Sequence, residues 1–247
     1  MLKSGKSRAI LAVVVAAAIG LFAYFQTREQ SAEAAHNALT QAAQTPSQAA
    51  LFNQLSDDFG DEYQQFLTEL AAGKGDLSEQ ESFAAGAGFT QNLRRDNAQY
   101  VASAPMDDLR AINQASLTLL ESLQDDPALC GRFAILGGGG LTMEEAQSLD
   151  MDIIAASAAA AFKAMAAGRD TPVEHPAASD GDIVQTLSMW QVLPDVTPDM
   201  MRAISSADPD HPAQCAANLS FQRFVMNNED PVVQRAMIRL VQLSMGI

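Results

Sequence analysis

An unbroken apolar segment occupies residues 9–25, where the sequence reads AILAVVVAAAIGLFAYF. A helix of these 17 residues is about 26 Å long, enough to cross the hydrocarbon core of a slightly thinned bilayer. Three basic residues precede the segment within 1–8, and only Arg28 follows it closely. Because Lys and Arg accumulate on the cytoplasmic side of a span, we predict a cytoplasmic N-terminus at 1–8 and a transmembrane signal anchor at 9–25. The remaining chain is then translocated.

A cleaved secretory signal is the alternative interpretation of the same segment. Ala32-Glu33-Ala34 has the small-x-small pattern of a cleavage site, so the mature chain would begin at Ala35. The apolar part of such signals usually runs for about 7–15 residues, and this one is longer. Charged residues such as Arg28 also precede the site. These features favour the uncleaved anchor, and both interpretations place the bulk of the chain outside the cytoplasm.

The chain after the apolar segment divides into a polar connection and a long region with helical periodicity. Residues 26–44 are polar and rich in Ala and Gln, which predicts a stalk or linker. From residue 45 to 247, apolar residues recur at spacings of three and four, as on one face of an α-helix. Thr45 and Pro46 are residues typical of a helix start. The first apolar stripe predicts one helix to about residue 70; it consists of Leu51, Phe52, Leu55, Phe59, Tyr63, Phe66, Leu67 and Leu70.

The same periodicity continues to the C-terminus and predicts an all-α fold. No segment shows the alternation of β-branched residues that is typical of strands. We therefore predict an N-terminal single transmembrane helix followed by an irregular multi-helix bundle at 45–247, with about seven to nine helices. Further helices are expected at 79–104, 106–123, 143–167, 183–193, 198–204, 215–225 and 231–245, with a short one around Cys130.

Small residues mark two places in this pattern. Residues 155–161 consist of six Ala and one Ser, so the helix that contains them is expected at the centre of the bundle. Gly86 and Gly88 lie in the interior of the predicted helix 79–104, where Gly is costly. We therefore expect another backbone to approach closely there. Gly168 is predicted to end the central helix, and the four glycines at 137–140 to form a loop.

The charge of the chain excludes one class of function. It carries 30 acidic and 15 basic residues, a formal net charge of −15. Without Lys3, Lys6 and Arg8, the translocated part has 12 basic against 30 acidic residues, a net charge of −18. Affinity for nucleic acid comes from Lys and Arg on the phosphate backbone, so no nucleic-acid partner is expected. Such a surface favours solubility and basic partners.

Two cysteines, Cys130 and Cys215, are the only ones in the chain. An even number of cysteines outside the cytoplasm favours a disulfide, so we predict a Cys130–Cys215 bond. Closing this 85-residue separation corresponds to about 4–5 kcal/mol in the loop-entropy estimate. No Cys-x-x-Cys motif indicates a redox-active pair.

The residue types that carry most catalytic and metal chemistry are sparse. The three histidines are His36 in the predicted stalk, expected to be solvated, and His175 and His211, each beside an acidic residue and a proline. Their spacings match no zinc or haem motif, so we predict neither a metal nor another cofactor. No Gly-x-Ser-x-Gly nucleophile motif is present. A single glutamate could still act as a general acid; the candidates are Glu62, Glu69, Glu81 and Glu121.

These observations favour binding over catalysis. We predict an inner-membrane protein with a single span and a periplasmic C-terminal domain, acting as a non-catalytic scaffold or accessory subunit for another envelope protein. The alternative is an enzyme that cleaves cell-envelope glycan with one glutamate as the general acid. A scaffold requires an exposed apolar surface, whereas such an enzyme requires a cleft holding a carboxyl group of raised pKa.

The first prediction concerns the N-terminus of the mature protein. N-terminal sequencing of the membrane-extracted chain is expected to find residues 1–8 still attached, because the apolar segment is retained as an anchor. A chain that begins at Ala35 would contradict the anchor and establish the cleaved signal instead.

Overall fold

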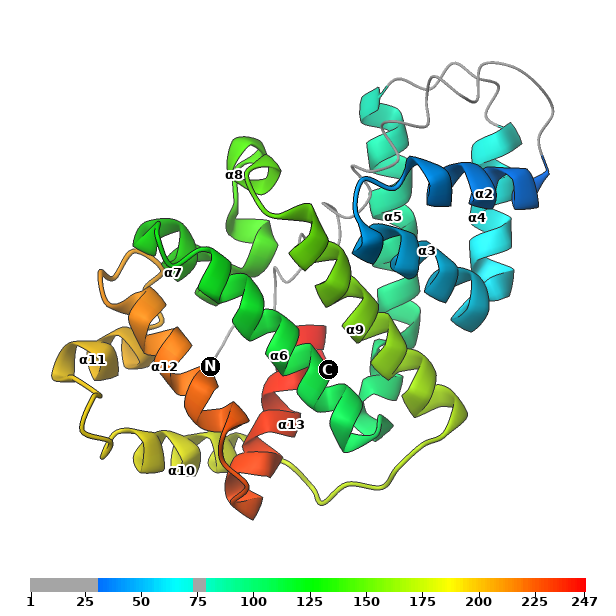
Figure 1. The fold of residues 1–247 in the computed structure, drawn as a ribbon. Coiled ribbons are helices and arrows are strands. Elements are labelled where there is room, and N and C mark those ends of the chain that lie inside the picture. The colour runs from blue at the N-terminus through cyan, green and yellow to red at the C-terminus, as the bar shows by residue number, and fades with distance from the viewer. Residues whose placement is uncertain (1–30, 73–78) are drawn as a thin grey trace.

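The computed structural model describes residues 31–72 and 79–247, and regular structure in these residues is helical throughout (Figure 1). The predicted all-α fold is therefore confirmed for the described part of the chain. The predicted cytoplasmic segment 1–8 and transmembrane segment 9–25 lie outside the described residues. The helices are α2 (Ala32–Ala42), α3 (Pro46–Asp58), α4 (Gly60–Ala72), α5 (Glu79–Asn97), η2 (Ala98–Ser103), α6 (Met106–Ser122), α7 (Pro127–Leu136), η3 (Gly137–Gly140), α8 (Met143–Gln147), α9 (Met151–Asp170), α10 (Asp180–Trp190), α11 (Pro198–Ser206), α12 (Gln214–Met226) and α13 (Pro231–Met245).

Helix α9 is the central element, as its alanine-rich sequence predicts. It packs against α3 on one side and against α6 and η2 on the other, and Figure 1 shows it running between the N-terminal helices and the rest of the fold. Its buried face is made mainly of small residues with a few large ones: Ile154, Ala155, Ala158, Ala161, Phe162, Ala164, Met165, Ala166 and Gly168. Among the described residues, α9 is the one helix apolar and long enough to resemble a membrane span, and half of its apolar window is buried in the core.

Polar bonds fix α3 against α9 along its length. The Ser47 amide donates to the Asp152 carboxylate at 3.1 Å, and the Gln54 side chain donates to the Ala159 carbonyl at 3.2 Å. At the far end, Arg169 donates to the carbonyl of Asp58 at 2.8 Å. Since all three bonds join positions about equally far along both helices, α3 and α9 run parallel.

The backbones of η2 and α9 approach closely at Gly168. A Cβ atom added there would lie 1.9 Å from the Tyr100 carbonyl oxygen and 3.0 Å from the Ala104 nitrogen. Only glycine allows η2 to lie so close to α9. Helix α9 continues to Asp170, so the prediction that Gly168 ends it was wrong. At Gly88, where we expected a close contact, a Cβ atom would meet nothing within 4 Å.

The predicted stalk at 26–44 is part of the folded domain wherever the structure describes it. Ser31 caps helix α2 by accepting from the Ala34 amide, and α2 packs against α3 and α4. Ala35 is fully buried and Leu39 is 2% exposed. The stalk prediction failed because the few apolar residues of α2 lie on one face, and only their packing partners show that this face is buried. His36, expected to be solvated, is half-buried with its Nδ1 atom 3.4 Å from the Tyr63 hydroxyl.

Three of the predicted helices are divided in the structure. The helix expected from residue 46 to 70 breaks at Phe59, whose φ and ψ of −134° and 44° leave the helical region, and the chain then continues as α4. The helix expected at 143–167 breaks before Asp150, whose carboxylate accepts from the amides of Asp152 and Ile153 and so starts α9. The helix expected at 79–104 ends in the 3-10 helix η2. In each case apolar periodicity continues across the break, so periodicity alone did not reveal it.

The second half of the fold is held together by a disulfide. Cys130 on α7 and Cys215 on α12 are bonded, with their Cα atoms 5.2 Å apart, so the structure pairs the two cysteines that we expected to pair. Next to them Gly131 lies close to α12, since a Cβ added to it would lie 3.0 Å from the Pro209 carbonyl oxygen and 3.2 Å from Gln214 Cβ. The two chain halves flanking Gly137–Gly140 share one core.

A glycine pair tests the close approach at α9. Gly168→Ala is expected to lower the free energy of unfolding by at least about 2 kcal/mol, because backbone atoms of η2 must move away. Gly88→Ala, also inside a helix but facing open space, is expected to raise it by about 0.5–1 kcal/mol. Urea unfolding followed by circular dichroism measures both. Equal effects of the two substitutions would contradict the packing described here.

Candidate binding site

The three histidines lie in separate places and form no common site. His36 contacts Tyr63 between α2 and α4, whereas His175 lies 2.6 Å from the carbonyl oxygen of Ala104 through its Nε2 atom. His211 accepts from the amide of Ala213 through Nδ1 at 3.1 Å. Within residues 31–72 and 79–247, no three His, Cys, Asp or Glu side chains cluster in a way that would hold a metal ion. His175 and His211 each contact backbone atoms of a connection between helices.

The glutamates proposed as general acids have ordinary surface surroundings where the structure describes their side chains. Glu62 is exposed, and Glu69 is exposed and accepts from Gln65 at 2.8 Å. Glu121 on α6 accepts from Arg223 on α12, at 3.0 Å from Nε and 2.7 Å from the terminal nitrogen. The side chain of Glu81 lies outside the described part. The structure does not bring Glu62, Glu69 and Glu121 together.

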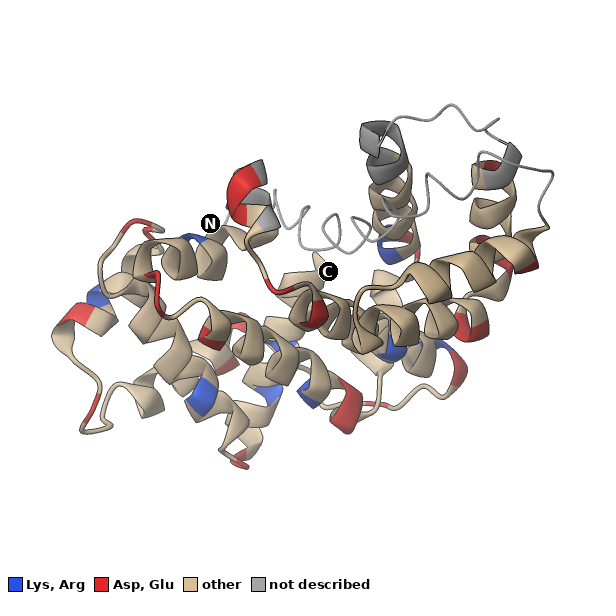
Figure 2. Cartoon of the chain, turned by 45° about the horizontal axis from the view of Figure 1, so that its top comes forward, with Lys and Arg blue, Asp and Glu red and all other residues tan. Residues whose placement is uncertain are grey.

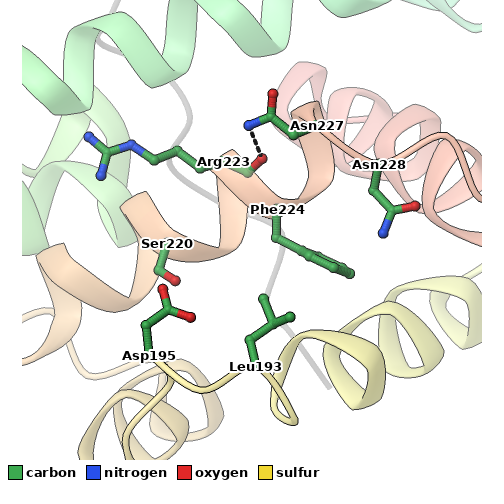
Figure 3. A pocket seen from close by; sticks show the side chains of 7 residues that line it. All are labelled: Leu193, Asp195, Ser220, Arg223, Phe224, Asn227 and Asn228. Carbon is green, nitrogen blue, oxygen red and sulfur yellow. Dashed lines mark hydrogen bonds between the residues drawn. The ribbon is translucent and has the colours of Figure 1, made fainter.

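A pocket lies where α12 faces the connection between α10 and α11 (Figure 3). Its volume is about 280 Å³, and it opens to solvent. Seven residues line it, three of them from α12, two from the connection and two from the segment after α12: Leu193, Asp195, Ser220, Arg223, Phe224, Asn227 and Asn228. We call this the α12 pocket.

The α12 pocket has one apolar side and one polar side. Figure 3 shows the Phe224 ring and the Leu193 side chain facing one another across the pocket, with Ser220 and Asp195 together beside them. Arg223 points away from this group, toward the Glu121 carboxylate that binds it. The exposed carboxylate of Asp195 has no hydrogen-bond or ionic partner among the described residues. The pocket thus offers an apolar contact next to a free negative charge.

The walls of the α12 pocket are fixed from behind by the core. Trp190, at the end of α10, is fully buried, and its indole nitrogen donates to the Ser220 hydroxyl at 3.0 Å. Its ring meets Phe221 edge to face, with 5.6 Å between the centroids. The disulfide at Cys215 holds one end of α12. The pocket therefore lies on a helix that is held near one end and near its middle.

An ion pair holds α10 in place beside the α12 pocket. Asp182 in the first turn of α10 accepts from Arg235 on α13 at 2.8 Å, and its side chain is only 10% exposed. It also accepts from the Ser179 hydroxyl at 2.7 Å. The Ser179 hydrogen bonds, together with the Arg235 guanidinium, hold the pKa of the Asp182 carboxyl below its usual range.

From residue 183 onward, the outer face of α10 and of the turn that follows it is exposed and uncharged. Val192 and Val184 are 76% and 63% exposed, more than any other large apolar side chain among the exposed ones in the described part. Their exposed neighbours are Gln185, Ser188 and Gln191, and no charged residue occurs from 183 to 194. We call Val184, Gln185, Ser188, Gln191 and Val192 the α10 face. It adjoins the α12 pocket, because Leu193 directly follows Val192.

All Lys and Arg side chains in the described part of the chain form hydrogen bonds or ion pairs within the protein. Each of the ten Lys and Arg residues in 31–72 and 79–247 has a polar partner, and eight of them pair with a carboxylate. The surplus charge is therefore negative. Figure 2 shows it distributed over the molecule rather than gathered in one patch.

Sequence reasoning did not find the α12 pocket. Its lining residues are distributed over three segments of the chain. In the sequence, Phe224 and Leu193 have the apolar spacing of ordinary core residues. The sequence does contain one signal for this region, which is the uncharged segment 183–194 within an acidic chain. This segment contains Val184 and Val192.

Comparison of the chain with protein-family models, with curated protein sequences and with solved structures found no match.

The ion pair behind the site predicts an acid-sensitive stability. Because the folded-state pKa of Asp182 is lowered, its contribution is present above the unfolded-state pKa and is lost as the pH falls through the lower folded-state value. Asp182→Asn is therefore expected to reduce the free energy of unfolding at pH 7, with the difference from wild type shrinking below about pH 4. Urea titrations between pH 2.5 and 7 measure this. Asp125→Asn, an exposed residue with no described partner, is the control at pH 7. A difference that stays constant with pH would contradict the assignment.

Proposed function

We propose that the protein is a membrane-anchored periplasmic scaffold or accessory subunit that binds another envelope protein. The observation that carries this proposal is the α10 face, where Val184 and Val192 are exposed beside the α12 pocket. Exposed apolar surface next to a pocket is typical of sites for protein partners. The α10 face and the α12 pocket together form the proposed binding surface.

The position of α2 supports the uncleaved anchor in this proposal. The first described helix begins at Ala32, only a few residues after the predicted span ends at Phe25. Those few residues can reach at most about 20–25 Å when fully extended, so the domain would lie close to the membrane surface. Cleavage after Ala34 would remove the Ser31 cap and leave a charged amino group on Ala35, which is fully buried in the fold.

The disulfide supports the proposed compartment. Cys130 and Cys215 form a bond in the core between α7 and α12, and no free cysteine occurs in the described part. Structural disulfides form in the periplasm and other oxidising places and are rare in the cytosol. Closing the 85-residue loop constrains the unfolded chain, which in the entropy estimate stabilises the fold by about 4–5 kcal/mol.

The carboxyl groups favour binding over glycan cleavage. A general acid needs a raised pKa so that it remains protonated near neutral pH. In the described residues, every carboxyl group with a clear shift has a lowered pKa, because hydrogen bonds hold its charged form. These groups are Glu145, Asp152, Asp170 and Asp182. Each caps a helix or pairs with an arginine, which is a structural role.

Site-specific photo-crosslinking in native membranes tests the proposed function. A photoreactive phenylalanine at Val192 of the full-length chain is expected to give one discrete adduct of higher mass, because Val192 lies in the proposed interface. The matched control places the same group at Glu69, an exposed position on α4, which is expected to give little or none. Equal adducts at both positions, or none at either, would contradict the proposal.

A further inference from the structure

We infer that the α12 pocket receives an apolar side chain of the partner together with a neighbouring Lys or Arg, whose cation pairs with Asp195. This inference rests on the proposed binding function and specifies its chemistry. The occupant is a short peptide segment of a protein, with a leucine-sized residue next to a basic one.

The size of the α12 pocket limits the occupant to one or two side chains. Pockets for cofactors and drug-sized ligands usually measure about 300–1,000 Å³ and enclose most of the ligand. The α12 pocket measures about 280 Å³ and is open to solvent. It therefore suits a side chain that projects from a larger surface, with the α10 face providing the remaining contact area.

The apolar part of the occupant follows from Leu193 and Phe224. Both side chains are partly buried and pack against the core from the pocket side. In the free protein they leave apolar surface facing the solvent-filled pocket (Figure 3). An inserted aliphatic side chain would remove that surface from water and stabilise the complex.

The positive part of the occupant follows from the charges around the α12 pocket. Asp195 is exposed and has no partner among the described residues. Arg223, the one cation among the lining residues, already donates twice to Glu121. An anionic group would meet Asp195 without a free cation to balance it, whereas an ammonium or guanidinium would complete an ion pair.

Among the polar lining residues, Asp195 carries the one charged group without a partner. The Asn227 amide already donates to the Arg223 carbonyl at 2.9 Å, and Asn228 Oδ1 accepts from the Asp230 amide at 2.9 Å. The Ser220 hydroxyl oxygen accepts from Trp190. Of the lining residues, Asp195 therefore presents the strongest unused hydrogen-bonding group, a charged acceptor.

The protein contains its own reporter for occupancy of the α12 pocket. Trp190 is the only tryptophan of the chain, and its indole bonds to Ser220 in the pocket wall. An occupant that displaces water from Ser220 or shifts its hydroxyl should change the fluorescence of Trp190. The indole is fully buried, so probes that merely collide with it from solvent have no access.

The test is a fluorescence titration of the full-length protein in lipid nanodiscs. The probes are three blocked dipeptides: acetyl-Leu-Lys-amide, acetyl-Leu-Glu-amide and acetyl-Ser-Lys-amide. Acetyl-Leu-Lys-amide is expected to give a saturable change and to bind roughly threefold more tightly than acetyl-Leu-Glu-amide, the range of one exposed ion pair. Acetyl-Ser-Lys-amide is expected to bind several-fold more weakly, because it lacks the apolar side chain.

Two variants assign the preference to Asp195. Asp195→Asn is expected to remove the difference between acetyl-Leu-Lys-amide and acetyl-Leu-Glu-amide, since the pairing charge is gone. Asp199→Asn, an exposed acid nearby in the chain that pairs with Arg202 and does not line the pocket, is expected to keep the difference. Equal binding of these two peptides to wild type, or no saturable change with any probe, would overturn the inference.

The crosslinking assay separates a failure of this inference from a failure of the proposed function. With the photoreactive group at Val192, Asp195→Lys is expected to lower the adduct yield at least fivefold, because a like charge would meet the partner's cation. An adduct at undiminished yield would refute the inference and leave the proposed function standing. If the chain with wild-type Asp195 gave no adduct, the proposed function itself would be contradicted. In the adduct that supports the inference, a Lys or Arg of the partner adjoins the crosslinked residue.

Discussion

The close approach of α9 to its neighbours is the constraint on which the rest of the structure depends. Small residues at 155–161 and a glycine at 168 let α3, α6 and η2 lie against one helix, so that distant parts of the chain share one core. Packing of this kind is sensitive to a single added methyl group. It is therefore a stronger constraint than apolar burial alone, which tolerates many side chains of similar volume.

In the second half of the fold, specific interactions also fix the helices that carry the α12 pocket and the α10 face. Helix α12 is held at one end by the disulfide and near its middle by the bond between Trp190 and Ser220. Helix α10 is held by Asp182 and Arg235. The α10 face and the α12 pocket are thus exposed surfaces on helices that are held in place. A surface that is already ordered loses little entropy when a partner binds.

The unpaired charge beside the α12 pocket is negative. Each described cation has a polar partner, and five of the eight described ion pairs join different helices, so the unpaired charges in the described part are acidic. Each such pair at the surface contributes little stability. Asp195 belongs to this unpaired set and lies beside apolar side chains. A negative surface of this kind steers basic partners and repels acidic ones.

The sequence by itself determined the helical fold class, the central place of the alanine-rich helix and the pairing of two cysteines, because apolar periodicity, small-residue content and cysteine count are local or compositional signals. Thr45 and Pro46 also located the start of α3 correctly. Only the tertiary structure decided that the supposed stalk is the packed helix α2, that the backbones meet at Gly168 and not at Gly88, and that Phe59 breaks a helix. The α12 pocket likewise depends on which distant segments meet. Apolar spacing shows that a face is buried, but the partner that buries it is set by long-range packing.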